Sequence, residues 1–132
     1  MADEAVCIET PTKFARRTVA EATVIPLGTL LEMDAGTNLC SASNADNDKF
    51  GGITWEEFSG GEGLTEVTVA LDGVWGIDCT AAAVINGALV NLAGANQINA
   101  AADGDFENGS IVGRCEQSSG GSEVVRVRLL GF

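Results

Sequence analysis

The sequence predicts an all-β protein, a small β-barrel or β-sandwich built from two similar half-units, with an extended N-terminal arm. Three features predict this fold. Residues 66–79, EVTVALDGVWGIDC, place apolar side chains at alternate positions, which is the period of a half-buried strand. The 132 residues include 17 glycines, many of them in short clusters typical of tight turns. The order of strands, turns and polar loops in the first half recurs in the second.

Residues 1–22 are expected to form the arm. Pro11 opposes a helix in this stretch, and the threonine and valine content favours an extended chain. We expect the arm to be poorly ordered in the isolated protein, because terminal segments order only where they are tied down. Residues 23–132 are expected to form a single domain.

The first half-unit is expected at residues 24–74. Pro26 and Gly28 occupy a turn within VIPLG, and the strand TLLEM follows. The turn DAGTN, the polar loop SNADNDKFGG, the strand ITWEEF and the turn SGGEG then lead into the long strand. Gly73 interrupts that strand and indicates a bulge or corner.

The second half-unit is expected at residues 83–132, and a single helical turn is expected at residues 80–84, where this half-unit begins. Its order is ING, ALVNL, AGAN, QINAAA, the polar loop DGDFENG, SIVGRCEQ, SSGGS and VVRVRLLGF. Many positions match the first half-unit at an offset of 58 residues: Val67 with Val125, Val69 with Val127, Leu71 with Leu129, Gly51 with Gly109 and Ile53 with Ile111. Earlier matches, such as Gly28 with Gly87, need 59. We therefore expect two related half-units, each burying its apolar face against the other.

Charge and hydropathy exclude several classes of partner. The net charge of −12 disfavours nucleic acid and anionic membranes as partners, because both are bound through lysine and arginine. No apolar run is long enough for a transmembrane helix, and the acidic N-terminus lacks the apolar core of a signal peptide. We therefore expect synthesis in the cytoplasm. The acidity suits either solubility at high protein concentration or a saline medium.

The sequence offers little catalytic chemistry. It contains no histidine, no GxSxG motif and no phosphate-binding Gly-Lys-Ser/Thr motif. Glu56 and Glu57 are adjacent, so a strand would point them to opposite faces and prevent paired acid–base catalysis. We expect no enzyme activity, no catalytic residue and no cofactor.

No metal site is expected either. Asp46 and Asp48 alternate as in the start of a calcium loop, but Lys49 and Trp55 stand where the loop requires glycine and glutamate. A solvated Asx turn is the better reading of this loop. The four cysteines form no CxxC pair, so buried free thiols are expected, with disulfides or a metal as the alternative: Cys7, Cys40, Cys79 and Cys115.

Two basic clusters are candidate contact sites. Three of the seven basic residues surround one aromatic residue in the arm, which suggests docking on another protein, with a solvated tail as the alternative: Lys13, Phe14, Arg16 and Arg17. Arg126 and Arg128 share the outward face of the last strand. They are candidates for contact with an acidic partner surface or another subunit, with a solvated strand face or an edge-protecting charge pair as the alternative. Trp55 and Trp75 are expected as core anchors in preference to sugar-stacking platforms.

The stretches GGITWEEF, SGGEG, VTVALDGVWGIDCTAAA, ALVNLAGANQI, GSIVGRCEQ and VVRVRL resemble a known family. They are similar to the small capsid cement, or decoration, proteins of tailed double-stranded DNA viruses, over about residues 20–132. SNADNDK and the four cysteines are not features of that family. The resemblance implies a compact β-barrel or β-sandwich on the outside of a mature icosahedral shell, as a trimer or sometimes a dimer where capsomers meet.

We therefore expect a virion structural protein that decorates the outer capsid surface and bridges capsomers against the pressure of packaged DNA. Its expected partners are the major capsid protein and further copies of itself, in a homotrimer or alternatively a homodimer. The alternative function is a carbohydrate- or receptor-binding β-module of a virion spike or tail appendage, which would place Trp55 or Trp75 on the surface. An enzyme or enzyme inhibitor acting through carboxylates is the third reading.

Overall fold

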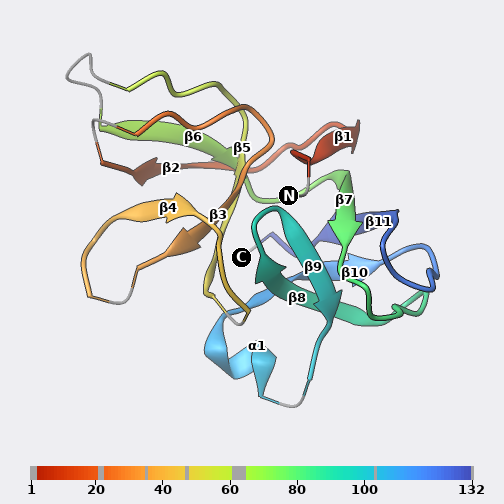
Figure 1. Cartoon of the computed structure of the whole chain (residues 1–132). Coiled ribbons are helices and arrows are strands. Elements are labelled where there is room, and N and C mark those ends of the chain that lie inside the picture. Colours follow the sequence, from red (N-terminus) through yellow and green to blue (C-terminus); the bar gives the residue numbers. More distant parts are fainter. Residues whose placement is uncertain are drawn as a thin grey trace.

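A computed structural model describes residues 3–20, 23–34, 36–46, 48–60, 65–102 and 104–131. Within them the chain forms eleven strands and one single-turn helix, so the predicted all-β fold class is confirmed (Figure 1). The strands fall into two sheets, one from the first half of the chain and one mainly from the second.

The first sheet is five-stranded and antiparallel. Its strands lie in the order β2 (Phe14–Thr18), β6 (Glu66–Ala70), β5 (Phe50–Thr54), β3 (Leu30–Met33) and β4 (Cys40–Ala42). Val19, directly after β2, forms a parallel bridge with Cys40 in β4. The two ends of the sheet therefore meet, and the sheet curls into a small barrel.

The second sheet contains β7 (Val74–Cys79), β11 (Val124–Leu129), β10 (Ile111–Cys115), β8 (Leu89–Gly94) and β9 (Gln97–Ala100), in that order. It closes when Asp78 and Cys79 of β7 pair in parallel with Gln97 and Ile98 of β9. β1 (Val6–Glu9) adds antiparallel to the remaining part of the same edge of β7. This second barrel thus carries one additional strand.

The two barrels repeat one topology. The order β2-β6-β5-β3-β4 in the first barrel matches β7-β11-β10-β8-β9 in the second, strand for strand. An isolated bridge between Ile25 and Phe58 likewise matches one between Val84 and Ser119. The repeated units therefore run from β2 to β6 and from β7 to β11, and each begins earlier than the expected ranges 24–74 and 83–132.

The repeat does not keep a single spacing. Leu31 pairs with Gly52 as Val90 pairs with Gly113, and a β-bulge follows in both barrels, so β5 and β10 correspond at an offset of 61 residues. The linker before β10 is three residues longer than the linker before β5, and the linker before β11 is three shorter than the linker before β6. The offset of 58 therefore returns in the last strands. The predicted matches of Gly51 with Gly109 and of Ile53 with Ile111 are wrong.

Each barrel has its own core. Val67 and Val69 are fully buried in a cluster that contains only residues of the first barrel and its loops. Val125 and Val127 are also fully buried, but in the cluster of the second barrel. The alternation of buried residues along these strands is confirmed. The expectation that one half covers the other is wrong, because each sheet curls and buries its inner face by itself.

The outer face of the first barrel packs against the second barrel. Leu30, Ile53 and Ala70 belong to the core cluster of the second barrel, although their strand neighbours face the first core. Polar contacts fix the junction, since Asn96 Oδ1 accepts a hydrogen bond from the Leu30 amide at 3.0 Å. The Ser43 hydroxyl donates to the Gly94 carbonyl at 2.8 Å.

The expected arm is built into the barrels. Of residues 1–22 the structure describes 3–20, which are extended but supply β1 to the second barrel and β2 to the first. Between these strands, the Asp72 carboxylate accepts hydrogen bonds from the amides of Thr12 and Lys13 at 2.7 and 2.9 Å. The segment therefore does not stand apart from the barrels, because its backbone completes both sheets.

The helical turn lies elsewhere than expected. Residues 80–84 contain no helix, and α1 (Asp105–Asn108) forms in the loop predicted to be irregular. Gly104 and Gly109 flank it with φ of 89° and 79°, a conformation that favours glycine. The buried Asp105 carboxylate accepts a hydrogen bond from the Ala102 amide at 2.6 Å. Across the described residues no helix is long and apolar enough to span a membrane.

Candidate interaction surfaces

The strand β2 divides the arm cluster between two faces. Phe14 and Arg16 point to the exposed face, whereas Arg17 points to the opposite, half-buried face. The Lys13 ammonium donates to the Gly131 carbonyl near the C-terminal end of the chain. The structure therefore places these four residues in different surroundings and not on one continuous adhesive strip.

Phe14 belongs to an aromatic cluster at the junction of the barrels. Its ring centroid lies 5.8 Å from that of Trp55, which lies 5.9 Å from Trp75 in an edge-to-face arrangement at 85°. Trp75 is 2% exposed and donates from Nε1 to the Asp72 carbonyl, so it is a core anchor. Trp55 is 36% exposed and Phe14 43%, and both therefore present part of a ring to solvent.

Arg16 forms a polar group on the exposed face of β2 and β6. Its guanidinium donates to the Thr68 hydroxyl at 3.0 Å and lies 3.4 Å from a Glu66 carboxylate oxygen. A Glu56 oxygen lies at 4.0 Å. More than half of the Arg16 side chain is exposed, so these ion pairs add little to stability and leave the group open to a partner.

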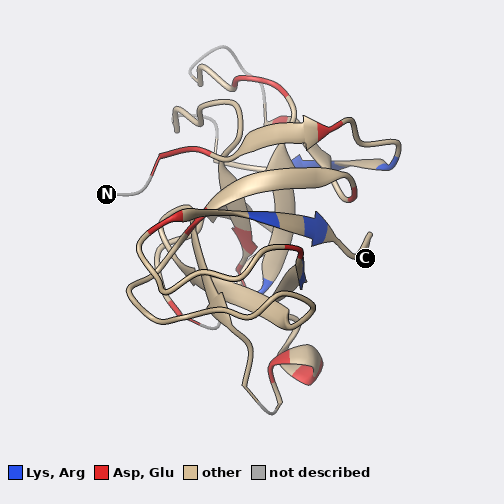
Figure 2. Ribbon diagram, turned by 90° about the vertical axis from the view of Figure 1, so that its right-hand side faces the viewer, with Lys and Arg blue, Asp and Glu red and all other residues tan. Residues whose placement is uncertain are grey.

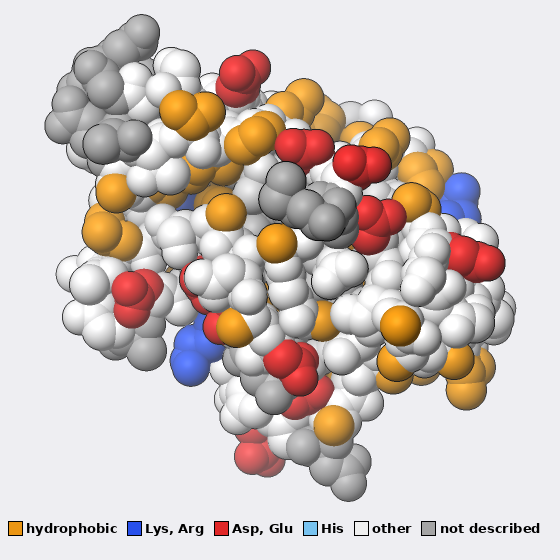
Figure 3. Space-filling model, in the orientation of Figure 1, with side chains coloured by type: hydrophobic (Ala, Val, Ile, Leu, Met, Phe, Trp, Pro, Cys, Tyr) orange, Lys and Arg blue, Asp and Glu red, His pale blue; other side chains and the backbone are white. Residues whose placement is uncertain are grey.

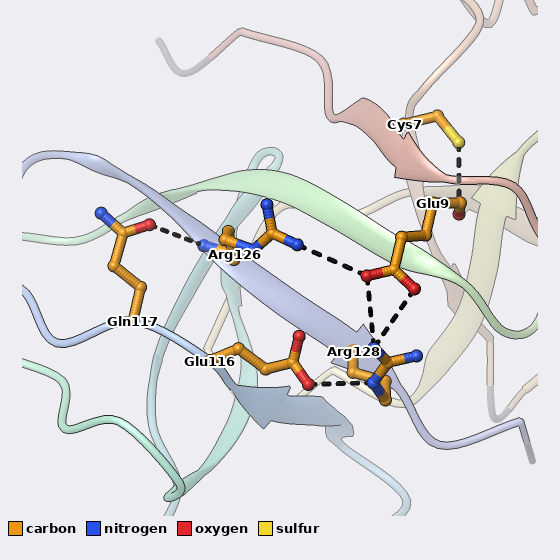
Figure 4. A network of polar contacts seen from close by, with 6 residues as sticks. All are labelled: Cys7, Glu9, Glu116, Gln117, Arg126 and Arg128. Atoms are coloured by element: carbon orange, nitrogen blue, oxygen red, sulfur yellow. Dashed lines mark hydrogen bonds and ion pairs between the residues drawn. The ribbon is translucent and has the colours of Figure 1, made fainter.

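Arg126 and Arg128 form an ion-pair network across three strands (Figure 4). Arg128 lies 3.3 Å from Glu9 of β1 and 2.9 Å from Glu116, which follows β10. Arg126 lies 3.4 Å from the same Glu9 carboxylate. Hydrogen bonds to Glu116 and Glu9 raise the pKa of Arg128. Because β11 lies between β7 and β10, this pair does not protect a sheet edge, and its charges are matched within the chain.

An exposed apolar patch lies beside this network on the outer face of the second barrel. Val6 and Val124 are 65% and 56% exposed, and Ile8 is 43% exposed. The side chains of Val124 and Ile8 lie over Gly76, since a Cβ added there would lie 3.1 Å from Val124 and 3.7 Å from Ile8, and Val6 is the strand partner of Gly76. From the sequence, β1 was assigned to the extended arm, and that arm was expected to be poorly ordered. The apolar patch was therefore not predicted.

The charges are unevenly distributed. Figure 2 shows acidic residues spread over the loops and α1, whereas basic residues gather on a few strands. The face seen in Figure 3 carries scattered acidic and apolar side chains and few basic ones.

The cysteines and the aspartate loop are structural. All four cysteines are free thiols as predicted, but only Cys40, Cys79 and Cys115 are buried, and Cys7 is half-buried. Burial raises the pKa of the thiols of Cys7, Cys40 and Cys79, which keeps them protonated. The Asp48 carboxylate accepts hydrogen bonds from the amides of Asn44 and Ala45, as expected of a polar turn. Among the residues that the structure describes, no acidic and thiol side chains gather into a metal-binding group.

One carboxyl group titrates unusually. Glu32, half-buried on β3, has its pKa raised to about 7 by burial first and then by a hydrogen bond with the Asp48 carboxylate. The Ser41 hydroxyl, which donates to Glu32 at 3.1 Å, opposes this shift. Burial and this contact therefore favour the protonated form of Glu32 on the surface of the first barrel.

These features define the chain as an all-β protein, a tandem of two closed five-stranded barrels. No protein-family model matches the sequence, and no curated protein matches it. A solved structure does match the fold: the crystal structure of the N base of the head fiber gp8.5 of bacteriophage phi29. The TM-score is 0.54 at 14% identity, and the match covers 88% of this chain and 93% of that one. At this identity the similarity shows a shared fold.

Proposed function

We propose that this chain is a virion structural protein of a tailed bacteriophage, attached to the outer face of the head. The observation that carries the proposal is the extent of the structural match, since both barrels correspond to nearly the whole base of a phage head fiber. The sequence resemblance to capsid cement proteins suggests the same location independently.

The finer proposal is capsid decoration. A cement protein must be rigid and must present contact groups, and it needs no active site. The two closed barrels supply rigidity, because each has a separate core and the junction is packed. We propose the major capsid protein as the partner and a homotrimer, or alternatively a homodimer, as the binding form. Several weak contacts in a symmetric oligomer would combine into tight attachment.

A second candidate is the base of a head appendage, which the name of the matching protein favours. In that case the chain would anchor a projecting structure at selected sites on the head. A sugar- or receptor-binding role would use the exposed rings of Phe14 and Trp55, which lie beside the polar groups of Arg16 and Glu56. Quenching of tryptophan fluorescence by a tested oligosaccharide would support that role, because Trp55 is partly exposed.

Electron cryo-microscopy of particles from a lysate that contains this protein tests the proposal. Mass spectrometry first establishes whether the protein copurifies with the heads. Density for the tandem barrel at every equivalent lattice site would support decoration, whereas density at the root of sparse projections would support an appendage base. A protein that separates from the particles during purification and leaves no density would overturn both.

A further inference from the structure

An elongated groove runs along the junction of the two barrels. Its central hollow, of about 470 Å³, lies between Arg17, Met33 and Lys49 of the first barrel and α1 with Ile111 of the second. A second hollow, of about 370 Å³, shares Met33 and Lys49 with it. A third, of about 360 Å³, shares Phe106 and Ile111. The second and third hollows thus each border the central hollow, through different residues, and we call the three together the junction groove.

The walls of this groove are held in place by backbone contacts. The Phe50 amide donates to the Gly109 carbonyl at 2.9 Å, which ties β5 to the end of α1. Figure 1 shows α1 beside the loop that leads into β5. A Cβ on Gly109 would lie 3.8 Å from Lys49, so the helix end packs close to the lysine stem. The groove is therefore formed before any ligand binds.

Two cations at the centre of the groove lack acidic partners. Arg17 donates from Nε to the Gly51 carbonyl at 2.9 Å, and its terminal amino groups form no ion pair with any described residue. Lys49 likewise forms no ion pair within the described part of the chain. Glu107 in the central hollow and Asp34 in the second hollow also border the groove, but neither forms an ion pair with Arg17 or Lys49 among the described residues. In a protein of net charge −12, two unmatched cations in one hollow indicate a site for an external anion.

Apolar side chains line the part of the groove that lies toward β8 and β9, whereas the second hollow is bordered by the polar residues Asp34, Thr37 and Asn38. Met33, Phe50, Phe106 and Ile111 line the central hollow, and the third hollow is bordered mostly by small apolar side chains of β8, β9 and the following residues. The length of the groove, with a cationic centre and an apolar end, matches an extended peptide better than a compact molecule. An extended chain presents alternate side chains to such a surface.

We propose that the junction groove binds an extended acidic–apolar segment of a partner protein. A glutamate or aspartate of that segment would contact Arg17 and Lys49, and a neighbouring apolar side chain would lie against Phe106 and Ile111. The identity of the partner as a head protein rests on the proposed function, whereas the chemistry of the groove does not.

Titration of the ¹⁵N-labelled protein with a blocked peptide, acetyl-Ala-Val-Glu-Val-Ala-amide, tests the groove directly. We expect amide shifts at Phe50, Ala101 and Gly109, and binding about tenfold weaker for the peptide with glutamine in place of glutamate. The affinity for the glutamate peptide should also fall with added salt. Absence of shifts at millimolar peptide, or equal binding of both peptides, would overturn the inference.

Matched variants locate the contact. Lys49→Gln changes an exposed side chain without ion pairs and is expected to weaken peptide binding about tenfold. Arg17→Gln is expected to act similarly, whereas Arg16→Gln, the neighbouring residue on the opposite face of β2, should leave binding unchanged. Equal affinities of K49Q and the unaltered protein for the glutamate peptide would contradict the inference. Failure to find the protein on phage particles would overturn the proposed function and leave the peptide result standing.

Discussion

Val19 forms a parallel β-bridge with Cys40, and this contact closes the first barrel. It corresponds to the parallel pairing of Cys79 with Ile98, which closes the second. The first strand of each unit therefore meets the third, and the same closing contact occurs at matching positions of the repeat. In the first barrel this strand comes from the N-terminal segment, so the segment is needed for closure.

Removal of residues 1–20 is expected to unfold the first barrel and to weaken the second. The truncation deletes β2 with Val19 from one sheet and β1 from the other. It also leaves backbone groups of β6 unpaired. Circular dichroism and thermal melting measure the effect. As a control, removal of residues 1–3 deletes no strand and should leave the melting temperature within a few degrees. A fully folded 1–20 truncation would contradict the role assigned to β2.

Val125→Asp is expected to abolish cooperative folding, at a cost of about 4 kcal/mol or more, because it places an unpaired charge in the core of the second barrel. Val124→Asp is the matched control, since the neighbouring side chain is 56% exposed on the outer face and should change stability by less than about 1 kcal/mol. Urea denaturation measures both. Similar midpoints for the two variants would mean that the strand faces are wrongly assigned.

Gly113→Ala is expected to destabilise the protein severely. A Cβ at this position would lie 2.1 Å from the carbonyl oxygen of Arg128, which belongs to the paired strand β11 and cannot move independently. The cost should exceed about 3 kcal/mol. Gly120→Ala is the control, because no atom lies within 4 Å of its added methyl group. Equal melting temperatures for G113A and the unaltered protein would contradict the described packing of β10 on β11.

The raised pKa of Glu32 predicts that the stability of the fold depends on pH. Its folded-state pKa of about 7 exceeds the ordinary value of 4.5, so folding favours the protonated form. The contribution to stability is complete below pH 4.5 and is lost as the pH rises through 7. The loss should be on the order of 1 kcal/mol, because the side chain is partly solvated.

Glu32→Gln should remove this dependence and make the protein more stable than the unaltered chain at pH 8. Urea denaturation between pH 4 and 8 measures the difference, with Glu57→Gln, an exposed carboxyl group, as the control. If E32Q and E57Q follow the same pH curve, Glu32 does not carry the effect.

The alternation of apolar residues and the internal repeat predicted much of the fold. The alternation in residues 66–79 located β6 and β7, and the matches of Val67 with Val125 and Val69 with Val127 located β11. The predicted offset of 58 residues was wrong for β5 and β10, because the linker before β10 is longer than the linker before β5. The shorter linker before β11 then restores the offset, and no local sequence pattern reveals these two changes of length. The helical turn was misplaced for a related reason, since glycines flanking a polar loop are equally compatible with an irregular turn and with α1.

The contact sites were foreseen only in part. The basic residues of β2 stood out by composition, but alternation along the strand separates Arg16 from Arg17 and places only the latter in the junction groove. Lys49 was noted only as a misfit in a calcium loop. Its place beside Arg17 depends on the pairing of β5 with α1 and β3, which joins segments far apart in the chain.

By itself the sequence determined which residues alternate between core and solvent, and hence the strands and the repeat, because a period of two is a local property of an extended chain. Only the tertiary structure decided that each half closes on itself, that the N-terminal segment completes both sheets, and which charges meet. Those outcomes depend on strand register and on barrel closure, which are set by contacts between residues distant in sequence.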